Sequence, residues 1–147
     1  MKQLSEVINE IAVHGNTSQN DNAEEIVETM NDILDGLFLK CEDIVGAVIS
    51  SLDGNAWAER LQSGFDKYRF AAMSSALLAL SDNLSSEAQI GSIENTLIEG
   101  SAGKIFLLHA GQDLLLTVFI QKGANLGLAL AYARQATQSL ATISLRS

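Results

Sequence analysis

The chain has 147 residues, 47% of them hydrophobic, which is enough for one compact domain with its own core. Its formal charge is −9 and it has no cluster of lysine or arginine, so nucleic acid is disfavoured as a partner. No apolar run approaches the ~18 residues of a membrane span, and Glu6 and Glu10 interrupt any signal-like segment. We therefore expect a soluble, cytoplasmic protein without membrane insertion.

The N-terminal region differs in composition from the rest, because residues 1–43 hold ten of the eighteen acidic residues. Apolar residues recur at helical spacing over residues 3–13, which predicts a short amphipathic helix. Residues 14–22 are polar and predict a linker, and Asp21 with Glu24 resembles a capping box that would begin the next helix. The expected division is an extension and linker over residues 1–22 and a domain over residues 23–147.

The first part of that domain shows a helix followed by a hairpin. An apolar stripe opposite an acidic face predicts a helix that begins near Glu24 and ends near Phe38. Residues 44–52 (IVGAVISSL) then have the composition of a strand, and Asn55–Leu61 of a return strand. Asp53 and Gly54 lie between them, and this dipeptide suits the positive φ angles of a tight hairpin.

The second part begins with a long helix over residues 66–84, rich in alanine, serine and leucine. Residues 92–99 and 104–109 predict two strands, and Leu114–Ile120 predicts a third that is apolar on both faces. After Gly123 the hydrophobic period changes to about 3.6, which predicts a final helix as far as Leu140.

Short connections between consecutive strands favour antiparallel pairing, so the hairpin and the three later strands should form one five-stranded sheet. Helices must cover both faces, because the central strand is apolar on both. The expected fold class is α/β in the α+β sense, a five-stranded antiparallel sheet with helices on both faces.

Motifs for catalysis, cofactors or metals are not evident in the sequence. Neither GxxxxGK[ST] nor GxGxxG occurs, so the chain has no sequence signal for binding nucleotide phosphates itself. His109 ends a strand without a nucleophile motif, and His14 has no partner at metal-ligand spacing. Cys41 is the only cysteine and is interpreted as a small buried hydrophobic residue. We expect a protein that is not an enzyme and has no cofactor or metal.

Four arginines could in principle stabilise the negative charge of a transferred phosphoryl group. They are Arg60, Arg69, Arg134 and Arg146. Lone surface arginines more often serve only to solubilise, and we expect no arginine finger among these four.

Two segments, with the order of elements around them, resemble the roadblock family: VGAVISSLDGNAWA (Val45–Ala58) and DLLLTVFIQKGANLGLALAYARQA (Asp113–Ala136). This family is typified by dynein light chains of the roadblock type, roadblock subunits of lysosomal scaffolds and bacterial partners of Ras-like GTPases. The resemblance covers about residues 24–143. It implies a profilin-like sandwich with the middle helix on one face and the first and last helices on the other.

The resemblance also implies a homodimer in which the strands over Ser92–Glu99 pair across a two-fold axis and the small-residue helices pack together. Its implied interface residues are Tyr68, Ala72, Ser75, Ala76, Ala79, Ile93, Asn95 and Leu97. An unpaired edge strand and a helix faced with alanine and serine are compatible with that dimer. They are also compatible with a monomer, since alanine is the best helix former and Glu94 and Glu99 would shield the edge.

The function implied by the resemblance is that of a non-enzymatic homodimer that binds a small Ras-like GTPase and regulates or scaffolds it. The alternative is a structural dimerisation subunit of a larger motor or signalling complex without a GTPase. A small-ligand sensor is a third reading, because related sandwiches hold ligands between sheet and helix. No polar residues converge in the predicted core to support that third reading.

Overall fold

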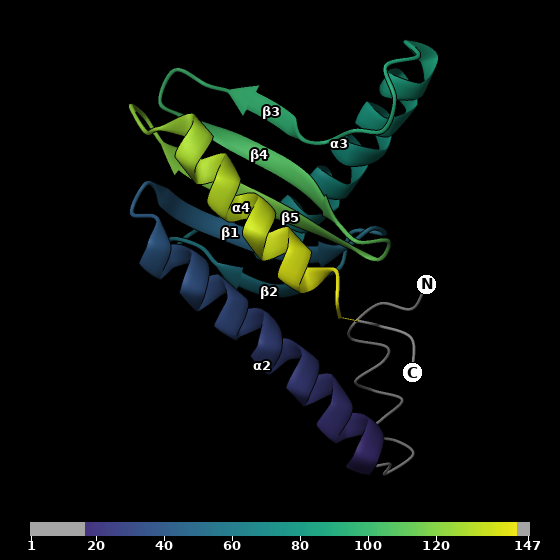
Figure 1. The fold of residues 1–147 in the computed structure, drawn as a ribbon. Helices are drawn as coiled ribbons and strands as arrows, with labels where there is room; N and C mark the ends of the chain where they lie inside the picture. Colours follow the sequence, from purple (N-terminus) through teal and green to yellow (C-terminus); the bar gives the residue numbers. More distant parts are fainter. Residues whose placement is uncertain (1–16, 144–147) are drawn as a thin grey trace.

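The computed structural model describes residues 17–143, which fold into one sheet with helices on both of its faces (Figure 1). The predicted helix over residues 3–13, together with His14 and Arg146, lies outside these described residues. In chain order the elements are α2 (Thr17–Lys40), β1 (Ile44–Ser51), β2 (Ala56–Arg60), α3 (Lys67–Glu87), β3 (Thr96–Glu99), β4 (Gly103–Ala110), β5 (Leu114–Gln121) and α4 (Leu126–Leu140).

All neighbouring strands in the sheet are antiparallel, in the order β2-β1-β5-β4-β3. The hairpin β1–β2 and the meander β3–β4–β5 are joined where β1 pairs with β5, and Ile49 lies opposite Leu116. The predicted five-stranded antiparallel sheet is therefore confirmed. Its edges are β2 and β3, at opposite sides of the sheet (Figure 1).

The predicted placement of the helices is also confirmed, because two separate sets of core residues lie on the two faces. On one face, Met30 and Leu34 of α2 and Ala133 of α4 pack against a sheet surface that includes Leu116 and Val118. On the other face, α3 covers residues of opposite parity, with Leu78 packed against Leu107 and Leu115. The strand β5 is buried from both sides, as its apolar composition requires.

The helix α3 covers only one end of its sheet face. Contacts join Ala71 to Val48, and Leu78 to Leu107, near the end of the sheet where β1 finishes and β5 begins. Figure 1 shows the C-terminal half of α3 projecting away from the sheet beyond the β3 edge. The other end of this face therefore has no helix over it within residues 17–143.

The start of α2 differs from the sequence-based expectation. The helix begins at Thr17, so residues 17–22 are helical rather than part of a linker, and Asp21 does not cap it. The segment TSQNDN contains neither glycine nor proline, and so nothing in its backbone prevents the helix from extending toward the N-terminus. The division into an extension and a domain stays a prediction.

The strand predicted over residues 92–99 is shorter in the structure. Only Thr96–Glu99 forms β3, and the preceding residues connect α3 to it. Two side-chain contacts anchor this connection: Ile93 packs against the cluster under α3, and Asn95 accepts a hydrogen bond from Nη2 of Arg134 at 3.3 Å. The edge strand expected over residues 92–99 is therefore about twice as long as the strand in the structure.

The membrane expectation can be compared with the helices themselves. Across residues 17–143, the helices lack the combination of length and apolar character that crossing a bilayer requires.

Candidate functional site

The surface formed by α3, β3 and the connection between them holds all the residues that the resemblance implied for a dimer interface. The helix begins with a defined cap, since Oδ1 of Asp66 accepts hydrogen bonds from the backbone N–H groups of Tyr68 and Arg69 at 2.9 and 3.4 Å. It ends at Glu87, after which the connection returns to the sheet. This cap and the contacts of α3 with the sheet fix which residues face solvent.

The five predicted residues of α3 are not equally accessible. Tyr68, Ala72, Ala76 and Ala79 are exposed, with Tyr68 at 67%. Ser75 is half-buried, and its hydroxyl donates a hydrogen bond to the carbonyl oxygen of Leu52. Ser75 therefore anchors α3 to the β1–β2 turn, and its hydroxyl proton is already used.

The three predicted residues around β3 lie in different environments. Ile93 is half-buried in the core cluster under α3, and Asn95 is half-buried beside Arg134. Leu97 is 42% exposed, and it lies opposite Phe106 in the register, so it shares the sheet face that α4 covers. The structure places Leu97 and the exposed residues of α3 on opposite faces of the sheet.

Sequence reasoning assigned no role to the large apolar residues that are most exposed on this surface. Met73, Leu80, Leu84 and Ile90 are 53%, 64%, 68% and 74% exposed, and Ile98 on β3 is 41% exposed. The sequence did contain a signal for these residues, because α3 has more apolar residues than a single sheet-facing stripe can bury. Such a concentration of exposed apolar side chains marks an interaction surface.

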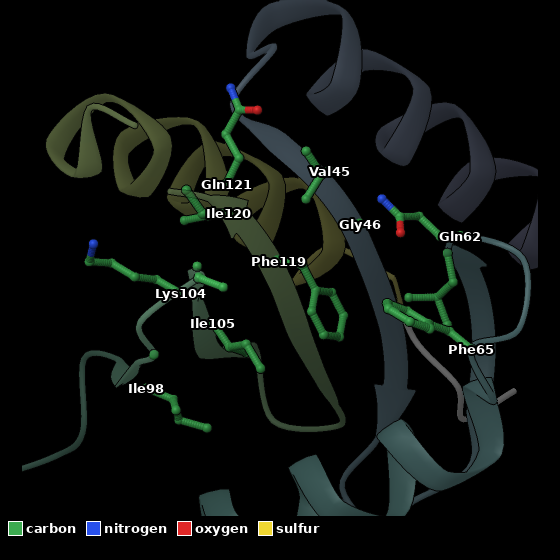
Figure 2. A pocket seen from close by; sticks show the side chains of 14 residues that line it. Val45, Gly46, Gln62, Phe65, Ile98, Lys104, Ile105, Phe119, Ile120 and Gln121 are labelled. Carbon is green, nitrogen blue, oxygen red and sulfur yellow. The ribbon is translucent and has the colours of Figure 1, made fainter. Parts of the chain in front are cut away.

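A groove of about 490 Å³ lies on the same sheet face as α3, over the end of the sheet that α3 leaves open. Figure 2 shows Phe119 in the middle of the groove, Phe65 along one wall, and Ile98 and Ile105 along the other. Phe70 of α3 joins the two aromatic residues: its ring centroid lies 5.6 Å from Phe65 and 5.0 Å from Phe119. The groove is therefore apolar along its floor.

The polar residues at the rim of the groove offer little for chemistry. Gln62, Lys104 and Gln121 are the polar side chains that line it, and no histidine, cysteine or carboxylate does so. Within residues 17–143, His, Cys, Asp and Glu side chains do not gather in groups of three or more that could hold a metal ion. The groove has the character of a docking surface for apolar side chains.

Other candidate residues from the sequence have structural partners. Nε2 of His109 lies 3.0 Å from Oδ2 of Asp82 on α3, and Cys41 is buried in the main core. Arg60 donates hydrogen bonds to Asn31 at 2.9 Å and to Asp35 at 2.7 Å on α2. These contacts tie helices to the sheet.

The sequence matches the family model described as the Roadblock/LC7 domain over residues 30–119. Among its relatives are two uncharacterized proteins of Methanocaldococcus jannaschii. One, MJ1340, is 31% identical over 101 residues, which cover 69% of this chain and 88% of the relative. The other, MJ0310, is 34% identical over 89 residues, which cover 60% of this chain and 77% of the relative.

Solved structures with similar folds include MglB of Myxococcus xanthus, with a TM-score of 0.73 and 17% identity over 78% of this chain and 86% of that one. A Roadblock/LC7 domain of Streptomyces avermitilis has a TM-score of 0.67 and 20% identity over 72% of this chain and 89% of that one. Profilin IB of Acanthamoeba castellanii has a TM-score of 0.51 and 14% identity, covering 68% of this chain and 86% of its own. These likenesses confirm the expected profilin-like sandwich.

Proposed function

We propose that this chain, which belongs to the Roadblock/LC7 domain family, is a non-enzymatic homodimer that binds a small Ras-like GTPase and regulates or scaffolds it. Family membership is the observation that carries the proposal. The exposed apolar side chains on α3 and β3 support the homodimer and the binding of a partner, because soluble monomers rarely expose large apolar patches.

The GTPase, rather than this chain, would supply the nucleotide site. The chain has no GxxxxGK[ST] segment, and in the described residues the groove presents one lysine and two glutamines at an otherwise apolar surface. A regulator of this kind acts by holding one conformation of the GTPase, whose switch segments differ between nucleotide states. Binding should therefore depend on the nucleotide.

The arginines give little support for direct participation in phosphoryl transfer. Arg60 is held by Asn31 and Asp35, and Arg134 contacts Asn95 and Glu94. An arginine that reaches a partner's active site must leave such contacts and lose their hydrogen bonds. We propose that any effect on GTP hydrolysis arises through the conformation of the GTPase. We also propose that the two proteins meet in the cytoplasm.

A binding titration tests the proposal directly. The purified full chain is titrated into a Ras-like GTPase encoded near it, loaded either with GDP or with a non-hydrolysable GTP analogue. We expect at least a tenfold difference in Kd between the two nucleotide states, equivalent to about 1.4 kcal/mol. Equal affinity for both states would support scaffolding only, and absence of binding to every neighbouring GTPase would contradict the proposal.

The alternative is a dimerisation subunit of a larger complex without a GTPase. A structure with a similar fold favours assembly: MglB in a tetrameric arrangement, with a TM-score of 0.70 and 16% identity. Purification of the complex from its native cells separates the two functions. A GTPase among the co-purified subunits supports the leading proposal, whereas a motor or scaffold without one supports the alternative.

A further inference from the structure

A second groove lies between the helices α2 and α4, on the face of the sheet opposite α3. Figure 1 shows α2 and α4 together on this face, and their core residues form one cluster with it. The groove has a volume of about 640 Å³. Thr29, Ile33 and Gly36 of α2 line one wall, and Tyr132 and Ala136 of α4 line the other. Residues 17–143 leave this space between the two helices unfilled.

The floor of the α2–α4 groove is apolar and its rims are polar. Ile33 and Tyr132 are half-buried against the main core. Gly36 has no side chain to fill the groove, and a Cβ atom built on it would meet nothing within 4 Å. Thr29 and Ser139 are exposed and lie on the two rims. An apolar floor between polar rims fits an amphipathic segment with a single apolar stripe.

The sequence before α2, which lies outside the described residues, contains a segment with this pattern. Its apolar residues recur at helical spacing: Leu4, Val7, Ile8 and Ile11. Glu6 and Glu10 fall on the opposite side of the same pattern, so the stripe can be buried while both carboxylates stay in water. A helix of this length is marginal in water unless its stripe packs against another surface.

The start of α2 brings this segment within reach of the groove. The segment joins α2 at Thr17, and along the helix axis Thr29 lies about 18 Å and Ile33 about 24 Å from that point. A helix over residues 3–13 would be about 16 Å long, and the three residues 14–16 add about 10 Å when they are extended. The segment can therefore reach the end of the groove nearest the start of α2.

Attachment to α2 favours this segment over a separate molecule as the occupant of the groove. Gly15 lies in the connection, and glycine adopts the backbone conformations that a reversal of the chain requires. A short tether holds the segment at an effective concentration of about millimolar, so even a weak contact with the groove is populated. The groove is on the face opposite α3, so the segment does not compete with association through α3.

We propose that residues 3–13 fold back along α2 of the same chain and occupy the α2–α4 groove at its near end. Ile8 then lies beside Thr29, and Leu4 lies beside Ile33. The contact closes the α2–α4 face, so a partner that binds this face must first displace the segment. The proposal depends neither on the homodimer nor on a GTPase.

Hydrogen exchange in the full chain tests the contact with two matched variants. Ile8→Glu places a charge on the apolar stripe, whereas Asn9→Glu places the same charge on the polar side of the segment. In the wild type, the backbone amides of residues 5–13 should exchange at least about tenfold more slowly than in an unstructured peptide. Ile8→Glu should reduce this protection at least about fivefold, and Asn9→Glu should leave it within about twofold. Unprotected wild-type amides, or an equal effect of both variants, would overturn the proposal.

Disulfide formation in the full chain locates the contact and identifies the chain that makes it. Native Cys41 is buried, so two added thiols can be followed beside it. Under mild oxidation, Ile8→Cys with Thr29→Cys should close within one chain at least about tenfold faster than Ile8→Cys with Glu28→Cys. Glu28 and Thr29 are both exposed neighbours on α2, but their side chains point about 100° apart around the helix. A disulfide between two chains, or equal rates for the two pairs, would overturn the proposal.

Discussion

The carboxylate of Asp82 lies 3.0 Å from Nε2 of His109, and this contact joins the C-terminal half of α3 to the end of β4. The two side chains are 42% and 31% exposed, so water screens the interaction. It nevertheless lies beyond Leu78, at the point where α3 begins to leave the sheet. The pair therefore links the C-terminal half of α3 to β4.

We expect Asp82→Ala to lower the free energy of unfolding by about 0.5–1 kcal/mol, the usual contribution of a partly exposed hydrogen-bonded pair. Urea unfolding of Asp82→Ala, His109→Ala and the double variant measures the coupling between the two side chains. Glu87→Ala on the exposed end of α3 is the control and should change stability less. Fully additive effects of the two substitutions would show that the contact contributes nothing.

Two glycines should respond in opposite directions to the same substitution. A Cβ atom at Gly103 would lie 2.9 Å from the carbonyl oxygen of Ile120, which belongs to the paired backbone of β5. The strands must separate to admit it, and so Gly103→Ala should cost about 1–3 kcal/mol, as overpacking does. A Cβ atom at Gly36, near the C-terminal end of α2, meets nothing within 4 Å.

Gly36→Ala should therefore stabilise the protein by about 0.5–1 kcal/mol, through the gain in helix propensity. Thermal unfolding monitored by circular dichroism measures both variants under one set of conditions. A decrease in Tm for Gly36→Ala would mean that this part of α2 contacts something beyond the described residues. An unchanged Tm for Gly103→Ala would show that β4 and β5 adjust without loss.

The main architecture could be predicted because its signals are local. The run Leu114–Ile120, six apolar residues and one threonine, requires a strand covered on both faces, and Asp53-Gly54 marks the turn, with Gly54 at a φ of +93°. The start of α2 was missed because a capping signature at Asp21 does not prevent a helix from continuing upstream. The start of β3 was missed because Ile93 is half-buried by a tertiary contact, which no periodicity records.

The candidate site was predictable only in outline. The small residues of α3 drew attention, yet Met73, Leu80 and Leu84 are large apolar residues that this helix exposes. The sequence of α3 is apolar over much of its circumference, so its pattern cannot say which side rests on the sheet. That choice is made by contacts far apart in sequence, among them Asp82 with His109 and Ser75 with Leu52. The groove itself is formed by four strands and two connections, β2–α3 and β3–β4.

Two buried threonines allow a test of how polar atoms are accommodated in the core. Thr117 of β5 is 1% exposed, and its hydroxyl has no hydrogen-bond partner among residues 17–143. Thr137 of α4 is 8% exposed, but its hydroxyl donates to the carbonyl oxygen of Arg134 at 2.8 Å. Both side chains have the shape of valine, so the substitution mainly removes the hydroxyl.

Thr117→Val should raise the free energy of unfolding by about 1 kcal/mol, because a buried hydroxyl without a partner carries an uncompensated desolvation cost. Thr137→Val should lower it by about 0.5–1.5 kcal/mol, since it removes the hydrogen bond that the hydroxyl donates to the Arg134 carbonyl oxygen. Urea unfolding at one protein concentration measures both free energies, with equal m-values confirming that the unfolded states are comparable. A destabilised Thr117→Val would reveal a bound water or a partner that satisfies the hydroxyl. The core between α3 and the sheet would then be more polar than its side chains indicate.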